Sequence, residues 1–421
     1  MKPQPLPWCE PLALARALNA PSMVLLHSSA ATHYSGDTSL LAVDCLESVD
    51  IERFSDIDAL LSQQKSRWFG FLGYELKHDC ERYSTAEKGE FALPRGRMMR
   101  FGAVYEFNHK LRTLVCCSDD VVALPALHDA SEIAPAAVKS LTSNMSKQEY
   151  LGKVKQVLSA IAEGDIYQAN LTRKFYGTWQ DESDTLSLFA RMCRLTPAPY
   201  SALIRMNGVD ILSSSPELFL RCDTDGVVET RPIKGSIARG ETVVEDEANR
   251  IALEQSSKNR AENLMIVDLM RNDLARACTQ GSVKVSKLFD VNTHATIHHM
   301  ASSITGQLRD DCSKAALIRD CFPPGSMTGA PKIRAVELCN QLETLERGVY
   351  SGALGWLDSD GSMELSVVIR TLIIKGTQFE FQVGGGIVAD SEPLAEWAET
   401  MEKSLGLINT LGVSRGQLES L

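Results

Sequence analysis

Strand-like and helix-like segments follow one another in blocks along this chain, and this order limits the folds open to it. The first part alternates strand-like runs with polar loops, and the runs cover 23–29, 40–46, 68–75, 101–107 and 111–117. A doubly wound parallel sheet needs a helix after almost every strand, and the sequence lacks that alternation. The sequence therefore predicts an α+β fold with antiparallel sheets.

The second half contains the clearest helix and turn signals. Ser146 and Glu149 have the spacing of a capping box, so a helix is expected to begin there and to stop at Gly164. Further on, Asn207-Gly208 lies between two strand-like runs and is a strong signal for a two-residue hairpin. We therefore expect a helix followed by a β-hairpin in this part of the chain.

The last third combines long helices with two strands. A charged helical stretch spans 245–277, and its apolar residues, Leu264 among them, indicate that it is largely buried. The runs at 363–374 and 379–385 each predict one strand, and the final helix is expected to begin near Pro393. Strands and helices thus stay in separate blocks to the end of the chain.

The composition changes once along the chain. Residues 121–145 are rich in Ala, Pro and Ser and show no periodicity, which is typical of a connecting segment. We expect this segment to join a β-rich region over 1–120 to a larger catalytic domain over 146–415.

The charge and the cysteines exclude several classes of function. A formal net charge of −11 gives no general attraction to nucleic acid or to acidic lipid, so a small molecule or another protein is the expected partner. The sequence shows neither a signal peptide nor a membrane-length apolar run, which predicts a cytoplasmic protein. Its 11 cysteines lack paired spacings, and this indicates reduced thiols rather than a zinc site.

Two carboxylates share one face of the final helix. Glu396, Glu399 and Lys403 are three and four residues apart, and two carboxylates on one face can bind a hard divalent cation through oxygen. The same spacing is also typical of a solvated ion-pair stripe. Glycines at 384–386 precede this helix; they could bring peptide N–H groups close to an anion, or simply form a tight turn.

Three further charged residues have two interpretations each. Glu262 lies within the long helical stretch, where it could serve a functional site or a structural polar network. Lys234 leaves a strand at a flexible corner; most such lysines are surface charges, whereas a buried one would have a lowered pKa and act as a nucleophile. Glu217 lies at a strand end, either solvated or acting as a general acid in a closed site.

Three histidines, His294, His298 and His299, lie close together in the sequence. Their run lacks the partnered spacing of a metal site. Histidines that are buried in the core or hydrogen-bonded are therefore the favoured interpretation.

Residues 146–412 carry a dense series of motifs. In order, these are GDIYQANLTRKF, SSSPELFL, TRPIKGSIARG, RAENLMIVDLMRNDLAR, HHMASSITGQL, FPPGSMTGAPKIRAVE, RGVYSGALGW and GGGIVADSEPLAEWAETMEKS. Their order and spacing resemble the chorismate-utilising family, which includes anthranilate, aminodeoxychorismate, isochorismate and salicylate synthases. The resemblance implies an α+β architecture in which two large antiparallel sheets pack together with helices outside.

The resemblance also implies roles for individual residues. Glu262 and Glu399 match the carboxylates that bind Mg²⁺, and Glu396 matches a helper beside them. Glu217 matches the general acid that protonates the departing ring hydroxyl. The residues that match contacts to chorismate are Arg370, Tyr350, Thr328, Lys403, Gly384 and Gly385. His299 matches a histidine near the ring, and its role in this branch stays open.

Two positions choose between branches of the family. Gln168 stands where the water-using members carry a lysine general base, which favours ammonia as the incoming nucleophile. Lys234 stands in PIKG, where anthranilate synthases have alanine, and this lysine is typical of the aminodeoxychorismate synthases. The resemblance implies that the Lys234 amine forms a covalent bond to the ring before ammonia displaces it.

Two regions depart from the family pattern. Asn259 stands where many relatives have an acidic group behind the metal site, which leaves the metal affinity open. Residues 23–29, MVLLHSS, stand in place of an LLES-like tryptophan-binding motif, so we do not predict feedback control by tryptophan.

The expected source of ammonia is a second protein. The sequence shows no glutaminase signature and no lyase segment, so the resemblance implies a heterodimer with a separate glutaminase subunit. Two alternatives remain open from the residues: the large subunit of anthranilate synthase, and a catalytically inactive regulatory subunit that binds chorismate.

Overall fold

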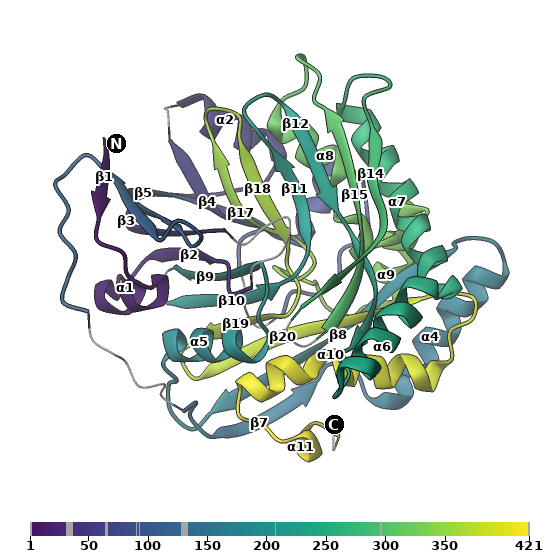
Figure 1. Cartoon of the computed structure of the whole chain (residues 1–421). Coiled ribbons are helices and arrows are strands. Elements are labelled where there is room, and N and C mark those ends of the chain that lie inside the picture. Colours follow the sequence, from purple (N-terminus) through teal and green to yellow (C-terminus); the bar gives the residue numbers. More distant parts are fainter. Residues whose placement is uncertain are drawn as a thin grey trace.

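Two antiparallel sheets that share one long strand form the body of the protein (Figure 1). The computed structural model describes residues 2–30, 37–63, 66–89, 91, 93–127, 134–206, 208–294 and 297–419. Every pairing between its named strands is antiparallel, and helices lie outside the sheets. The predicted α+β class is therefore confirmed.

The first sheet is assembled from both ends of the chain. Its strand order is β7 (Val138–Ser143), β8 (Gln168–Trp179), β20 (Gln378–Ile387), β19 (Thr371–Lys375), β10 (Val209–Ser215), β9 (Tyr200–Met206), β2 (Met23–His27), β3 (Thr38–Asp50), β5 (Gly96–Asn108), β6 (Thr113–Ser118) and β1 (Lys2–Leu6). The N-terminal strand β2 thus lies inside the sheet, between β3 and β9. The short strand β16 (Gly329–Ala330) adds to the end of β8.

The second sheet grows from β5. Its order is β5, β4 (Arg67–Leu72), β17 (Ala353–Asp358), β18 (Met363–Val367), β11 (Leu218–Cys222), β12 (Val227–Arg231) with β13 (Ile233–Ala238), β15 (Ile297–Gln307) and β14 (Lys284–Thr293). One half of β5 pairs with β4 and the other half with β6, so β5 belongs to both sheets. The β-rich N-terminal region therefore forms one body with the remainder.

Apolar side chains fill three layers. Residues of β2, β4, β5, β9, β10 and β17 form the layer between the sheets, where Phe71 is fully buried. The outer face of the first sheet packs against α1 (Pro11–Leu18), α5 (Thr185–Leu195) and α10 (Pro393–Thr410). The outer face of the second packs against α2 (Phe54–Gln63), α7 (Ser257–Ala277) and α8 (Lys314–Cys321). The sheets with helices on both outer faces match the predicted architecture.

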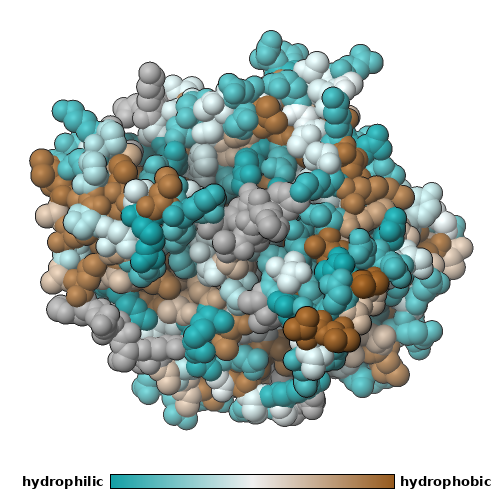
Figure 2. Space-filling model, viewed as in Figure 1, coloured by the Kyte–Doolittle hydropathy of each residue, from teal (hydrophilic) through white to brown (hydrophobic). Residues whose placement is uncertain are grey.

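The remaining elements are short or lie near the ends of β8. Helices α4 (Lys147–Ala162) and α9 (Lys332–Leu342) pack with α10 over β8. The others are α3 (Lys77–Cys80), α6 (Val243–Gln255), α11 (Arg415–Glu419) and the 3₁₀ turns η1 (Tyr74–Leu76) and η2 (Gly325–Met327). On the face shown in Figure 2, hydrophilic residues surround small groups of hydrophobic ones. Among the described residues, no helix combines the length and apolarity needed to cross a membrane.

Several local signals are confirmed. Ser146 and Glu149 form the capping box at the start of α4, and Gly164 follows the helix with a φ of 82°. Strands β9 and β10 form the expected hairpin, in which Gly208 has a φ of 75° and Asn207 lies outside the described residues. The last helix begins at Pro393.

The prediction of one continuous helical stretch over 245–277 is wrong. This stretch forms two helices, α6 and α7, and the Ser256 side chain accepts a hydrogen bond from the Asn259 N–H at the start of α7. A capping serine at this point starts a new helix instead of continuing the old one. Leu264, which was expected to be buried, is 44% exposed.

The single strand predicted over 363–374 is also wrong. It forms β18 and β19, which are separated by a turn at Arg370 with a φ of 51°. This left-handed conformation interrupts a β-strand, because only the extended region continues the ladder. Alternation of apolar residues gave no sign of the interruption. In the predicted connection over 121–145, residues 138–143 form β7, and 128–133 lie outside the described residues.

We predict that Phe71→Ala lowers the free energy of unfolding by about 3–5 kcal/mol, since it opens a cavity between the two sheets. Leu111→Ala, at a position that is 68% exposed, is the matched control and is expected to change stability little. Urea unfolding followed by tryptophan fluorescence measures both. Equal midpoints for the two variants would contradict a continuous apolar layer between the sheets.

Candidate active site

The two sheets converge where β13 approaches the end of β20. A Cβ atom added to Gly386 would lie 2.8 Å from the Gln168 amide nitrogen and 3.6 Å from the Lys234 Nζ. Any larger residue at 386 would collide with the Gln168 side chain, so glycine allows this approach. The convergence brings Lys234 of the second sheet beside Gln168 of the first.

Ser326, in the turn η2, lies beside both Lys234 and Glu217. The Lys234 Nζ donates to the Ser326 carbonyl oxygen over 3.2 Å. The Ser326 hydroxyl helps to lower the pKa of the Glu217 carboxyl, although the hydroxyl itself makes no hydrogen bond among the described residues. One backbone turn therefore places a lysine amine next to a carboxyl group.

Glu217 is only 3% exposed. Burial raises the pKa of its carboxyl from 4.5 to about 7, against the opposing influence of Ser326, Lys234, the Ile233 N–H and Arg370. Its Oε1 atom is buried without a hydrogen-bond partner among the described residues. A carboxyl group that is protonated near neutral pH can act as a general acid, which is the role that the family resemblance implied for Glu217.

The pKa of Lys234 is shifted in the opposite direction, below its ordinary value. Burial lowers the pKa of its amine, and the Lys403 ammonium lowers it further, while Glu217, Glu262 and Glu399 oppose the change. Lys234 is half-buried and its Nζ contacts the Ser326 carbonyl oxygen, so it is not an exposed surface charge. A neutral amine is the nucleophilic form of lysine.

Arg370 lies near the Glu217 carboxyl, and His299 lies beside Arg370. An Arg370 Nη2 lies 3.4 Å from the His299 Nε2, and the His299 Nδ1 is buried without a partner in the described part of the chain. Burial lowers the pKa of His299 well below its ordinary value, and Arg370 adds to this effect. His299 is therefore a neutral ring that can accept or donate a hydrogen bond.

The other two histidines are structural, as the sequence favoured. His298 lies 3.0 Å from an Asp246 oxygen and 2.9 Å from the Thr293 hydroxyl. The His294 ring packs 5.2 Å from that of His299 in an edge-on arrangement.

The acidic residues of α7 and α10 lie on the far side of Lys234. The Lys403 Nζ pairs with the Glu399 Oε1 over 2.6 Å and donates to the Gly384 carbonyl oxygen over 2.9 Å. Burial opposes ionisation of Glu399, but Lys403 lowers its pKa overall. For Glu262 burial dominates and raises the pKa, and the Glu399 charge adds to this. Glu262 and Glu399 therefore act on each other within one acidic site.

Glu396 stands beside this pair. Its Oε1 accepts from the Ser391 hydroxyl over 2.6 Å, and its Oε2 is buried with no partner in the described residues. A Cβ added to Gly385 would lie 3.0 Å from the Glu396 Oε2 and 3.8 Å from the Glu399 Oε1, so glycine lets both carboxylates approach β20. Among the described residues, no group of three or more His, Cys, Asp or Glu side chains is placed to hold a metal ion. Oxygen donors and one orphaned carboxylate oxygen still suit a hard cation that keeps water or substrate ligands.

Asn259 has a structural role. A Cβ added to Gly235 would lie 2.9 Å from the Asn259 Cγ, and Gly235 has a φ of 91°. The side chain of Asn259 therefore packs against the turn that follows Lys234. Its Nδ2 donates to the Ser256 hydroxyl over 3.0 Å.

Three predicted site residues have mixed outcomes. Gln168 is fully buried, and neither atom of its amide has a partner in the described part of the chain, so it faces the site with free hydrogen-bonding capacity. The Thr328 hydroxyl donates to the Gly325 carbonyl oxygen over 3.1 Å and is used within its own loop. Tyr350 is buried where Arg347 and Glu343 are the charges that affect its pKa. For Tyr350 and Thr328, contact with chorismate stays a prediction.

The comparisons with known proteins agree with this geometry. The family model for a chorismate binding enzyme matches residues 15–408. This chain belongs to the chorismate-binding enzymes. It is 39% identical to aminodeoxychorismate synthase component 1 of Escherichia coli over 339 residues, which cover 79% of this chain and 74% of that protein. It is 38% identical to aminodeoxychorismate synthase of Streptomyces griseus, of which it spans 50% of the length.

The fold is shared with solved chorismate-binding enzymes. Anthranilate synthase component I of Streptococcus pneumoniae superposes with a TM-score of 0.78 at 25% identity, over 87% of this chain and 91% of that one. The two-sheet architecture is therefore shared with that enzyme.

Sequence reasoning missed three residues that the structure brings to or near this site. Ser326 lay inside a quoted motif but was given no role, because a backbone carbonyl leaves no chemical signature. Gly386 was expected to approach an anion or to form a tight turn, whereas in the structure it leaves room for the Gln168 amide. Lys258 lies one turn before Glu262 and affects the pKa values of Glu262, Glu396 and Glu399. Arg347, in RGVYSGALGW, is 2% exposed and contacts the loop that carries Ser326.

We predict a pH-dependent stability difference for Glu217→Gln. Because the folded pKa of Glu217 is about 7 and the ordinary value is 4.5, the folded state binds the extra proton, and stability is lost as pH rises through this window. The side-chain amide of the variant Glu217→Gln does not titrate, so the variant does not lose stability in this pH range. The variant should gain up to about 3 kcal/mol relative to the native protein between pH 4.5 and 7.

Thermal melting of both proteins from pH 4.5 to 8 measures this difference. The exposed Glu163 provides the control variant Glu163→Gln, which should run parallel to the native protein at every pH. A constant difference between Glu217→Gln and the native protein would show that the carboxyl titrates normally in the folded state.

Proposed function

We propose that this chain is the chorismate-binding, amine-transferring subunit of aminodeoxychorismate synthase. It would convert chorismate and ammonia to 4-amino-4-deoxychorismate, the precursor of 4-aminobenzoate in folate synthesis. The observation that carries the proposal is the Lys234 amine, which shares the Ser326 turn with the Glu217 carboxyl. Similarity to aminodeoxychorismate synthase component 1 supports it.

Chorismate is a dianion, and the site offers matching donors. Arg370 can give a planar pair of N–H groups to one carboxylate, and Lys403 and the peptide groups of Gly384 and Gly385 border the acidic side. Tyr350 and Thr328 complete the proposed set of contacts. His299, neutral beside Arg370, would hydrogen-bond near the ring.

The first step uses Lys234 and Glu217 together. The neutral Lys234 amine attacks ring carbon two, the ring double bonds shift, and the hydroxyl leaves carbon four as water with a proton from Glu217. The lysine nitrogen, which is now bonded to ring carbon two, releases one of its protons. Hydroxide is a poor leaving group, so the proton from Glu217 is essential.

The second step reverses the shift. Ammonia attacks carbon four and loses a proton, the double bonds move back, and the Lys234 nitrogen takes up a proton and leaves carbon two as the free amine, so that the new amine takes the place of the lost oxygen. Gln168, with both amide atoms free, faces this side of Lys234 and can orient ammonia. A single displacement without lysine would leave nitrogen at carbon two, as in the anthranilate branch.

Magnesium is the proposed cofactor. Glu262 and Glu399 would hold the ion, and Glu396 would support it through its orphaned oxygen. Bound Mg²⁺ would neutralise and fix the ring carboxylate of chorismate. Lys258 and Lys403 balance the acidic charge from the protein side.

A glutaminase subunit is the proposed partner. The relative from Escherichia coli is named component 1, which supports a two-component enzyme in which ammonia comes from the other subunit. The heterodimer would work in the cytoplasm, on a small anionic substrate and without nucleic acid or membrane. These points follow from the family and from the composition of the chain.

The decisive test is product analysis with chorismate, Mg²⁺ and ammonium, coupled to an added aminodeoxychorismate lyase. The native protein should give 4-aminobenzoate only when the lyase is present. Lys234→Ala should lower the rate at least about a hundredfold, as expected for a group that takes part directly in the reaction. The control Lys375→Ala changes an exposed lysine on β19. Anthranilate or isochorismate from the native protein would overturn the proposal.

A second prediction concerns the metal. Glu262→Gln should weaken Mg²⁺ binding at least about tenfold, because a carboxylate ligand is replaced by a neutral amide. Asp268→Asn, at an exposed position on the same helix, is the matched control. Calorimetric titration with Mg²⁺ in the absence of chorismate separates binding from catalysis. Equal affinities for the two variants would place the metal elsewhere.

A further inference from the structure

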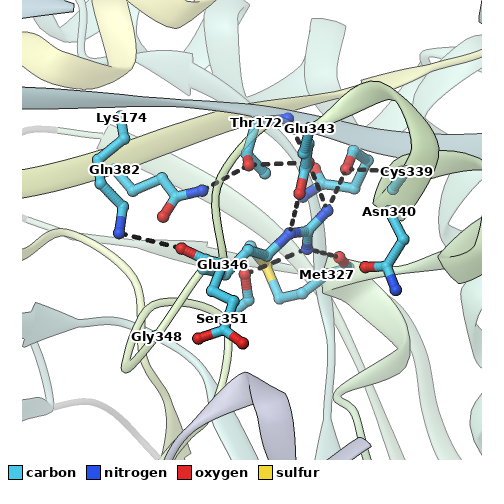
Figure 3. Close-up of polar contacts among 12 residues, drawn as sticks. Thr172, Lys174, Met327, Cys339, Asn340, Glu343, Glu346, Gly348, Ser351 and Gln382 are labelled. Atoms are coloured by element: carbon cyan, nitrogen blue, oxygen red, sulfur yellow. Dashed lines mark hydrogen bonds and ion pairs between the residues drawn. The ribbon is translucent and has the colours of Figure 1, made fainter. Parts of the chain in front are cut away.

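Arg347 lies in the interior behind the proposed active site, and each of its guanidinium nitrogens donates a hydrogen bond. Its Nε donates to the Glu343 Oε2 over 2.8 Å, and its Nη2 donates to the Glu343 Oε1 over 2.8 Å and to the Asn170 carbonyl oxygen over 2.7 Å. Its Nη1 donates to the Met327 carbonyl oxygen over 2.9 Å and to the Ser351 hydroxyl over 3.3 Å. Figure 3 shows three of these partners, Glu343, Met327 and Ser351, close to one another.

A second carboxylate holds the backbone of Arg347. The Glu75 side chain accepts from the Arg347 N–H over 3.0 Å and from the Gly348 N–H over 2.9 Å. Lys77 pairs with Glu75 over 3.6 Å, and the Arg347 guanidinium lies 4.4 Å from the centre of the Tyr74 ring. The interior thus holds two ion pairs, Arg347 with Glu343 and Lys77 with Glu75. The second pair comes from the N-terminal region.

The guanidinium contacts the loop that carries Ser326 and also the neighbouring strand β8. Met327 directly follows Ser326, and the Asn170 N–H donates to the carbonyl oxygen of Thr328 over 2.8 Å. Arg347 therefore ties the turn η2 to strand β8 through the carbonyl oxygens of Met327 and Asn170. This restricts the rotation that would move the Ser326 carbonyl away from Lys234.

A different cation holds the beginning of the same loop. The Lys332 Nζ donates to the carbonyl oxygens of Cys321 and Pro323, each over 2.9 Å, and pairs with Asp273 over 2.7 Å. These contacts lie before the turn, whereas Arg347 contacts the turn itself. Arg347 is thus the cation whose contact lies next to the residue that binds Lys234.

We infer that Arg347 is a positioning residue for the amine of Lys234: it fixes the Met327 carbonyl, so that the neighbouring Ser326 carbonyl holds the Lys234 Nζ toward the substrate. The inference rests on the proposed function, since it concerns the geometry of the proposed nucleophile. Arg347 itself does not contact Lys234 or the substrate.

Arg347→Lys is the informative substitution. Lysine keeps the positive charge opposite Glu343, but its single nitrogen cannot donate to the Met327 and Asn170 carbonyls with the geometry of the guanidinium fork. The charge balance is retained while the link to the turn is weakened. Arg347→Gln, which also removes the charge, serves as a second variant in case the first folds poorly.

The test is competitive acetylation of lysines by trace acetic anhydride across a pH series, read by peptide mass spectrometry. In Arg347→Lys, the midpoint for labelling Lys234 should fall by at least about half a pH unit, because the amine loses a carbonyl that stabilises its ammonium form. The midpoint of Lys375 in the same sample should stay constant. In parallel, kcat should drop at least about tenfold with KM for chorismate within about twofold.

Two matched variants separate positioning from stability. Arg205→Lys alters another arginine with several partners, Asp210, Thr185 and Asn19, which is remote from the site. Glu343→Gln disturbs the same interior cluster but leaves the donor to Met327 in place. Neither should shift Lys234. An unchanged or raised Lys234 midpoint in both Arg347 variants would overturn the inference, as would equal shifts in Glu343→Gln.

This experiment is independent of the reaction assigned to the site. If Lys234→Ala still aminated chorismate at the native rate, the proposed function would fail, while the labelling result would still show whether Arg347 positions the amine. If Lys234→Ala is inactive and the labelling midpoint does not move, only the positioning role is lost.

Discussion

The close approach of the two sheets at Gly386 is the contact on which the site depends. Each sheet carries part of the chemistry: Lys234 and Glu217 belong to the second, and Gln168 and the glycines of β20 to the first. Without a side chain at 386, the Gln168 amide and the Lys234 amine can lie close to β20. The site thus places polar groups where the two sheets meet.

Burial near this contact raises the pKa of Glu217 and lowers the pKa of Lys234. The same burial that favours a protonated Glu217 favours an unprotonated Lys234. A nucleophile without its proton and an acid with its proton are the forms that the proposed first step requires. One physical cause, exclusion of water from charged groups, therefore prepares both partners.

Sequence patterns predicted the class of fold and several element boundaries, because capping boxes and hairpin signals are local. They did not predict the interruption at Arg370, because its positive φ leaves no trace in the pattern of apolar residues. Motif matching assigned Glu217, Lys234 and Glu262 to one site, and in the structure the charges of Glu217 and Glu262 both act on Lys234. It overlooked Ser326, because the carbonyl that binds Lys234 is present in every amino acid and only the fold determines where it points.

The placement of the last strands has a consequence for synthesis of the protein. Strands β19 and β20 lie between β10 and β8 in the first sheet, although they come from the final sixth of the chain. Until the ribosome has released them, the sheet exists as two separate parts with unpaired edges facing each other. Such late, long-range pairing slows folding and leaves aggregation-prone edges open during translation. A chain of this topology thus depends on being finished before its central strands can find their partners.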